Sequence, residues 1–141
     1  MNFVVDASVA VKWFVEEELR AEARELVRRD EDLYAPALIL VEVSNALWKK
    51  VLRNEISDEQ ARRIGSWPHD LFSRLYPIDL LNRRALEIAL DLQHPVYDCL
   101  YLACAEEVED GYVVTADRRL RTAVESTAYE GLVVHLLDIT G

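Results

Sequence analysis

The sequence lacks a long apolar segment and a basic leader at its N-terminus. No part of the chain approaches the roughly 20 consecutive apolar residues that a membrane-spanning helix needs. Asp6 and Lys12 interrupt the first apolar run too early for a secretory signal peptide. We therefore expect a cytoplasmic protein that does not interact with a membrane.

Cysteine and basic charge are also scarce. The only cysteines, Cys99 and Cys104, lie in one apolar helical segment, and no neighbouring His or Cys completes a zinc-binding set. We expect two reduced thiols in the core. The formal net charge is −10, so the surface as a whole does not attract nucleic acid. This charge argues against a simple electrostatic nucleic-acid binder, but only weakly against a nuclease that uses a bound metal ion.

The rest of the composition favours one α/β domain. Hydrophobic residues make up 51% of the 141 residues, and we find no repeat, linker or low-complexity tract, so we expect a single domain over residues 1–141. Short apolar segments predict strands at 2–5, 33–35, 75–78, 112–115 and 132–137. Helical periodicity and helix-start signals predict helices at 7–14, 16–29, 36–52, 82–92, 96–109 and 118–125, and another from Ser57 that Pro68 should end or kink. This alternation predicts a parallel sheet covered by helices on both faces.

Four carboxylates occupy positions where an unpaired charge is costly. Asp6 and Asp117 each follow a predicted strand, Glu42 interrupts an apolar helix, and Asp98 lies at the start of another. An ionised carboxylate out of water costs on the order of several kcal/mol unless something pairs with it. No Lys or Arg is an obvious buried partner, so a shared divalent cation is suggested. Ligands of parallel sheets bind beyond the carboxyl ends of the strands, where Asp6 and Asp117 lie.

Each acid also has a structural alternative. Asp6 and Asp117 could cap the helices that follow them, and Asp98 could be stabilised by a helix dipole. Glu42 has the weakest alternative, because a structural carboxylate in an apolar helix would need a buried cation. We read Asp79, which ends another predicted strand, as the cap of the next helix.

Four segments around the acids carry a resemblance to a known family. They are VVDASVAVKW at 4–13, VEVSNAL at 41–47, VYDCLYLA at 96–103 and VTADRRL at 114–120. In order and spacing they resemble the PIN-domain ribonucleases, in particular the VapC-type toxins of bacterial and archaeal toxin–antitoxin pairs. The resemblance implies a three-layer α/β/α fold with a central parallel sheet of about five strands.

The resemblance also implies a function. A metal-dependent endoribonuclease of toxin type would hydrolyse RNA phosphodiester bonds with an acidic quartet at Asp6, Glu42, Asp98 and Asp117, which binds Mg²⁺ or Mn²⁺. Such ions suit oxygen ligands and activate water. The family further implies a homodimer and a cognate antitoxin protein.

Several polar residues are candidates for supporting roles. Ser8 and Thr115 could hydrogen-bond a ligand or a metal-bound water, or could cap a helix or turn. Asn45 lies one helical turn after Glu42 and could reach the same cleft. Basic runs are usually solvated, as the run at 49–53 could be, but Arg118 or Arg119 could contact a substrate phosphate. The three histidines, all outside the matching segments, are expected in loops or on strand faces; they are His69, His94 and His135.

Three other functions account for parts of the pattern. A haloacid-dehalogenase-like phosphatase usually needs a second Asp two residues after the first, and this chain has Ser8 there, which argues against that class. A receiver domain would carry a lysine near the end of the chain, and no Lys follows Lys50, which argues against that class too. A non-catalytic PIN-like module that binds a protein partner or RNA stays open, although such a module is expected to lose acids and none is lost here.

Overall fold

A single parallel sheet forms the centre of the molecule. The computed structural model describes residues 1–67 and 69–139, and its five-stranded sheet has the order β3-β2-β1-β4-β5. The strands are β1 (Asn2–Val5), β2 (Leu33–Pro36), β3 (Arg74–Tyr76), β4 (Gly111–Thr115) and β5 (Val133–His135). Every pairing between neighbouring strands is parallel, which confirms the expected sheet.

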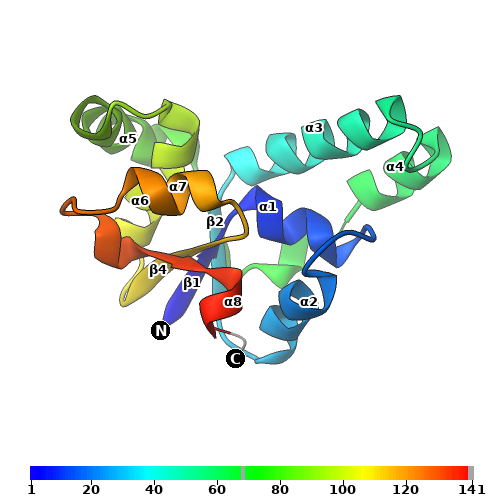
Figure 1. Cartoon of the computed structure of the whole chain (residues 1–141), viewed down its shortest axis with the longest axis horizontal. Helices are drawn as coiled ribbons and strands as arrows, with labels where there is room; N and C mark the ends of the chain where they lie inside the picture. Colours follow the sequence, from blue (N-terminus) through cyan, green and yellow to red (C-terminus); the bar gives the residue numbers. More distant parts are fainter. Residues whose placement is uncertain (68, 140–141) are drawn as a thin grey trace.

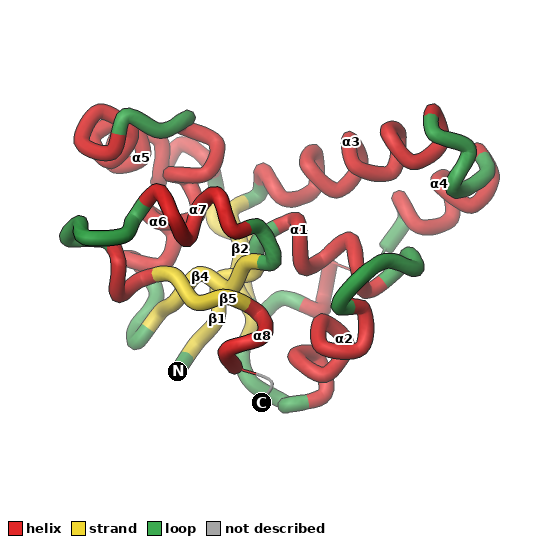
Figure 2. Tube along the Cα trace, viewed as in Figure 1, coloured by secondary structure: helices red, strands yellow, loops and turns green. Residues whose placement is uncertain are grey.

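Helices cover both faces of this sheet and complete the α/β/α layers (Figure 1 and Figure 2). The α-helices are α1 (Ala7–Ala10), α2 (Arg20–Arg28), α3 (Leu38–Leu52), α4 (Asp58–Gly65), α5 (Ile78–Leu92), α6 (Val96–Glu107), α7 (Arg118–Ala123) and α8 (Leu136–Ile139). Short 3₁₀ turns lie at Val11–Trp13, His69–Leu71 and Glu130–Leu132. Figure 1 shows α1 to α4 on one side of the sheet and α5 to α7 on the other, with α3 and α4 extending outward as a hairpin. Among the described residues, none of these helices has the length and apolarity to cross a membrane.

The strand order creates a crevice at the carboxyl edge of the sheet. From β1 the chain proceeds to β2 and β3 in one direction, and then crosses back to β4 and β5 on the other side of β1. Right-handed crossovers therefore place the connecting helices on opposite faces. The two connections diverge between β1 and β4, and such a switch point is where open α/β sheets bind ligands.

Apolar side chains of the central strands and of α6 form the core. Phe3, Val4 and Val5 are fully buried, as expected for a strand that lies inside a parallel sheet. Cys99 and Cys104 are free and buried, which confirms the prediction of reduced core thiols. Burial raises the pKa of the Cys99 thiol to about 11 and that of Cys104 to about 12, so neither is a ready nucleophile.

Two predicted boundaries are wrong. Helix α2 begins at Arg20 rather than at residue 16, because Leu19 has a left-handed backbone with φ of 65°. Upstream of it, Glu17 accepts ion pairs from Lys12 at 2.9 Å and Lys50 at 2.7 Å, so Lys50 is not part of a solvated face. Asp79 is not a helix cap either: Pro77 holds that position, and Asp79 lies in the first turn of α5.

Other boundaries agree more closely with expectation. Ser57 forms a capping box with Gln60 at the start of α4, as the sequence there predicts. Strand β5 is shorter than expected because the chain turns into α8 at Leu136. The predicted effect of Pro68 falls outside the described residues.

Candidate active site

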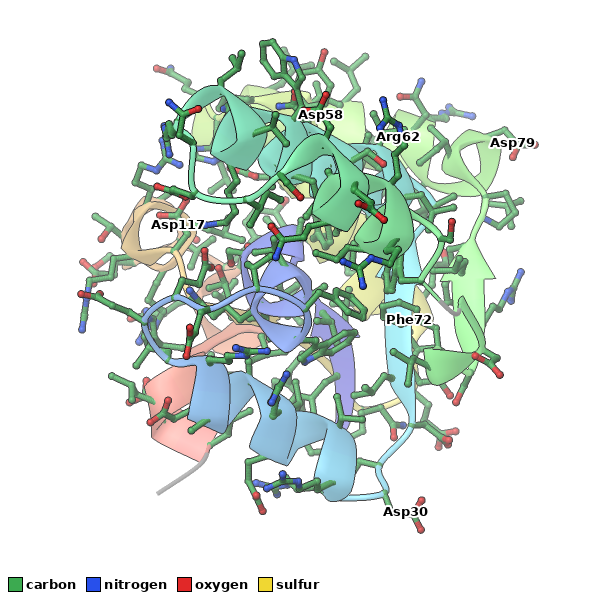
Figure 3. All side chains as sticks on the ribbon, turned by 90° about the vertical axis from the view of Figure 1, so that its right-hand side faces the viewer. Asp30, Asp58, Arg62, Phe72, Asp79 and Asp117 are labelled. Atoms are coloured by element: carbon green, nitrogen blue, oxygen red, sulfur yellow. The ribbon has the colours of Figure 1, made fainter. Side chains whose placement is uncertain are left out.

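One cavity of about 480 Å³ collects all four acids of the predicted quartet. Asp6 reaches it from the end of β1 and Asp117 from the end of β4, while Glu42 comes from the second turn of α3 and Asp98 from the first turn of α6. Figure 3 shows Asp117 at the start of α7, well separated from Asp79 on the other side of the same view. Four elements that are distant in sequence therefore present carboxylates to one space at the switch point of the sheet.

Asp6 is held by two hydroxyl groups, one from α1 and one from the end of β4. Ser8 Oγ donates to Asp6 Oδ2 at 2.7 Å, and Thr115 Oγ1 donates to the same oxygen at 2.8 Å. The backbone N–H of Ala116 donates to Ser8 Oγ, and that of Asp117 donates to Thr115 Oγ1. The Asp6 side chain does not cap α1, so the capping alternative for this acid is wrong. The network instead holds one carboxylate oxygen of Asp6 in a defined orientation.

Glu42 has a neutral partner where a buried cation was thought necessary. The hydroxyl group of Tyr101, one turn after Asp98 in α6, donates to Glu42 Oε1 at 2.6 Å. Tyr101 is fully buried, so the packed core fixes its ring, and its hydroxyl group orients the Glu42 carboxylate from the core side of the cavity. The half-buried Glu42 therefore does not require a lysine or arginine neighbour.

Asp98 and Asp117 each contact a basic side chain. His94 lies in the loop before α6, as expected, and its Nε2 is 2.6 Å from Asp98 Oδ2, a contact that was not expected. Asp117 accepts from the Arg119 guanidinium, from Nε at 3.0 and 3.2 Å and from Nη2 at 2.8 Å. Asp117 also accepts from the Arg119 backbone N–H at 2.9 Å, so its capping alternative is correct as a structural role.

The electrostatics of the acids show that they interact. Burial raises the pKa of Asp6 above its ordinary value, its two hydroxyl donors lower it in part, and the charge of Asp98 raises it again. Burial likewise raises the pKa of Glu42, and the charges of Asp6 and Asp98 add to that effect against the hydrogen bond it accepts. The Arg119 side chain lowers the pKa of Asp117. A cluster of acids that repel one another favours a bound cation.

The donor set fits a hard divalent cation in chemistry and in location. Carboxylate oxygens are the ligands that Mg²⁺ and Mn²⁺ prefer, and the four acids share one cavity. In their present conformations, no group of three or more His, Cys, Asp or Glu side chains within residues 1–67 and 69–139 is close enough to form a ligand set. Asp117 is paired with Arg119, so its carboxylate already has a cationic partner.

The supporting residues fall into three groups. Ser8 and Thr115 contact Asp6 directly. Asn45 is exposed and lines the cavity, as its spacing from Glu42 predicts. Arg119 lines the cavity, whereas Arg118 is exposed and is not among its described lining residues.

Sequence reasoning missed two contacts of the acids. His94 precedes Asp98 by four residues but lies before the start of α6, so helical spacing did not signal this contact. Tyr101 lies 59 residues from Glu42 in sequence, and no local pattern signals that pair.

Comparison with known proteins identifies the class of protein to which this fold belongs, the PIN domain. The family model of the PIN domain matches residues 3–125 of this chain. The crystal structure of PAE2754 from Pyrobaculum aerophilum covers 99% of this chain and 87% of its own, with a TM-score of 0.66 and 20% sequence identity, which supports the fold.

Curated relatives narrow the class further. Ribonuclease VapC3 of Pyrobaculum aerophilum is 32% identical over 122 residues, covering 85% of this chain and 92% of the relative. Ribonuclease VapC9 of Mycobacterium tuberculosis is 33% identical over 83% of this chain and 87% of its own. Ribonuclease VapC1 of the same organism is 40% identical over 63% of this chain and 65% of its own. The chain therefore belongs to the PIN-domain family and, within it, to the VapC-type ribonucleases.

Proposed function

We propose that this protein is a Mg²⁺- or Mn²⁺-dependent endoribonuclease, the toxin of a toxin–antitoxin pair, and that residues 1–141 act as a single PIN-like domain. The observation that carries the proposal is the convergence of four carboxylates from four elements on one cavity at the switch point of the sheet. The names of the relatives, all VapC ribonucleases, support the choice of RNA as substrate. The proposal implies a cytoplasmic protein, because RNA is its substrate.

The four acids would hold the metal, and each has a distinct local setting. The quartet is Asp6, Glu42, Asp98 and Asp117. A divalent cation bound there supplies an activated water and neutralises negative charge on the phosphate. The protein's own contribution is preorganisation, because ligands that are already oriented need not be ordered when the ion binds.

The hydrogen bonds of the acids provide this preorganisation. Ser8 and Thr115 both hold Oδ2 of Asp6, and Tyr101 fixes Glu42 through one oxygen. His94 holds Asp98 at the entrance of α6. Three of the four carboxylates thus accept hydrogen bonds from buried or half-buried side chains, while the fourth is held by an exposed arginine.

A nuclease assay with matched variants tests the proposal. Purified chain free of any partner protein is incubated with structured RNAs and Mg²⁺ or Mn²⁺, beside Asp6→Asn and Asp98→Asn, which remove charge and keep hydrogen-bonding groups. We expect both variants to lose cleavage, and Asp79→Asn, an exposed acid of α5, to retain it. Equal activity in all four samples would indicate a contaminating nuclease and refute the mechanism. Calorimetry that detects no Mn²⁺ binding would favour the non-catalytic module.

The family's partners belong to the same proposal. Helix α5 exposes Leu80, Leu86 and Leu90, and such apolar side chains support a homodimer. The net charge of −10 supports an antitoxin whose contacting segment is basic. Light scattering of the purified chain, alone and with the product of a co-encoded neighbouring gene, measures both associations.

A further inference from the structure

We propose that Tyr97 and Lys49 bind the RNA substrate beside the acids, with the Tyr97 ring stacked on a nucleobase and the Lys49 ammonium group on a phosphate. Both residues line the cavity that holds the quartet. The inference rests on the proposed ribonuclease function and assigns how the substrate is held at that site.

Tyr97 is an exposed ring on a helix that is otherwise largely buried. It directly precedes Asp98 in α6, and 65% of its surface is exposed, whereas Tyr101 one turn later is fully buried. Val41 of α3 lines the same cavity and is equally exposed at 65%. Packing in the core thus accounts for Tyr101 but not for Tyr97. An aromatic ring that faces solvent beside acidic residues provides a stacking surface for a base.

Lys49 lies on the same face of α3 as Glu42. Residues Glu42, Asn45 and Lys49 are spaced by three and four positions, so they form one stripe along the helix, and all three line the cavity. Lys49 lies about 10 Å beyond Glu42 along the helix axis, from the rise of about 1.5 Å per residue.

The neighbouring cations are already committed to acids. Lys50 is largely buried and pairs with Glu17 at 2.7 Å, and Arg119 pairs with Asp117. Lys49 is exposed and has no ion pair with any acid in the described parts of the chain. In a protein with a net charge of −10, an unpaired lysine in the acidic cavity is well placed to attract a phosphate.

Binding of a labelled RNA separates the two contacts. A short fluorescein-labelled single-stranded RNA is titrated with the full chain carrying Asp6→Asn, which prevents cleavage, and the anisotropy is recorded at several salt concentrations. In this background Tyr97→Ala should weaken binding by roughly 5- to 150-fold with an unchanged salt slope, and Tyr97→Phe should bind like the parent, because stacking needs only the ring. Lys49→Ala should reduce the magnitude of the negative slope of log K against log salt by about 0.7, the value for one phosphate of a single strand.

Two control variants match these changes elsewhere on the surface. Trp48→Ala removes an exposed ring from α3 that lines a groove with α4 and not the acidic cavity, and Arg83→Ala removes one exposed positive charge from α5. Neither should alter affinity or slope comparably. In the chain with the natural Asp6, Tyr97→Ala and Lys49→Ala should each lower kcat/KM for cleavage of the same RNA. This second assay tests both contacts if the Asp6→Asn chain binds RNA too weakly for anisotropy.

Several results would overturn the inference while leaving the proposed function intact. Cleavage and binding that do not respond to Tyr97→Ala would exclude stacking, and a loss in Tyr97→Phe as large as in Tyr97→Ala would assign the effect to the hydroxyl group. Dissociation of an oligomer by Tyr97→Ala, seen by light scattering, would assign the ring to a contact between copies. A natural chain that neither cleaves RNA nor binds Mn²⁺ would instead refute the proposed function itself.

Discussion

In the proposed metal site, Arg119 would compete with a divalent cation for the carboxylate of Asp117, and the strength of this competition can be estimated from the structure. The guanidinium group donates to both carboxylate oxygens, but its side chain is 87% exposed and that of Asp117 is 32% exposed, so water screens the pair. Exposed ion pairs contribute about 0.2–1 kcal/mol. If opening this pair is part of binding the metal, Arg119→Ala should raise Mn²⁺ affinity by about 1.4- to 5-fold beyond any general effect of charge.

Calorimetric titration of Mn²⁺ into the two variants Arg119→Ala and Arg118→Ala measures this effect. The matched variant removes the same charge one residue away, where no described acid forms an ion pair with it. The backbone N–H that donates to Asp117 is kept in both. We expect the affinity of Arg119→Ala to exceed that of Arg118→Ala. Equal affinities, or weaker binding by Arg119→Ala, would show that the pair does not oppose the metal and would refute the reasoning.

Three further predictions concern the acids and the scaffold. Because the pKa of Asp6 is raised in the fold, its ionised form destabilises the protein above that pKa, and the cost disappears as the pH falls through it. Asp6→Asn should therefore raise the Tm of the metal-free chain at neutral pH; calorimetry showing a lower Tm would contradict this. Metal ligands must be deprotonated and the pKa values of Asp6 and Glu42 are raised, so Mn²⁺ affinity should begin to fall at a pH above the ordinary carboxyl pKa values of 3.8 and 4.5. Tyr101→Phe removes a hydrogen bond that lowers the pKa of Glu42, so it should shift this fall in affinity to higher pH. Identical pH titrations of the natural chain and Tyr101→Phe would contradict the prediction. Ser57→Ala should cost about 1 kcal/mol in the free energy of unfolding by denaturant titration and leave RNA cleavage unchanged, because its capping box lies in α4 outside the cavity.

The central strands were predictable because one cause dominates there. Strand β1 has the bounds that its apolar run predicts, since a strand buried on both faces reads as a continuous apolar segment. The start of α4 was also predictable, because a capping box is local in sequence. The start of α2 was not. Glu17 reads as part of an amphipathic helix, but its contacts with Lys12 and Lys50 depend on the tertiary fold.

The location of the site was predictable for a related reason. Residues that follow parallel strands meet at one edge of the sheet, so Asp6 and Asp117 could be brought together without knowledge of the helices. The contacts that orient the acids were harder to predict from the sequence. Those of Asp98 and Asp117 are local, at spacings of four and two residues, whereas the partner of Glu42 is far away in the chain. A hydroxyl group in an apolar helix carries no sign that it reaches a carboxylate on another element.

The acidity of the whole chain also constrains how a phosphate can approach the cavity. Four carboxylates line it, and the cations among its described lining residues are Lys49 and Arg119, of which Arg119 is paired with Asp117. A polyanion entering this space before a divalent ion would meet a net negative site at close range. In the proposed site, metal binding should then precede RNA binding, because the ion would neutralise the acids and, if it displaces Arg119, would leave that arginine free beside Lys49. Arg119, which pairs with Asp117 without metal, would then be free to contact the substrate only after the metal ion has bound.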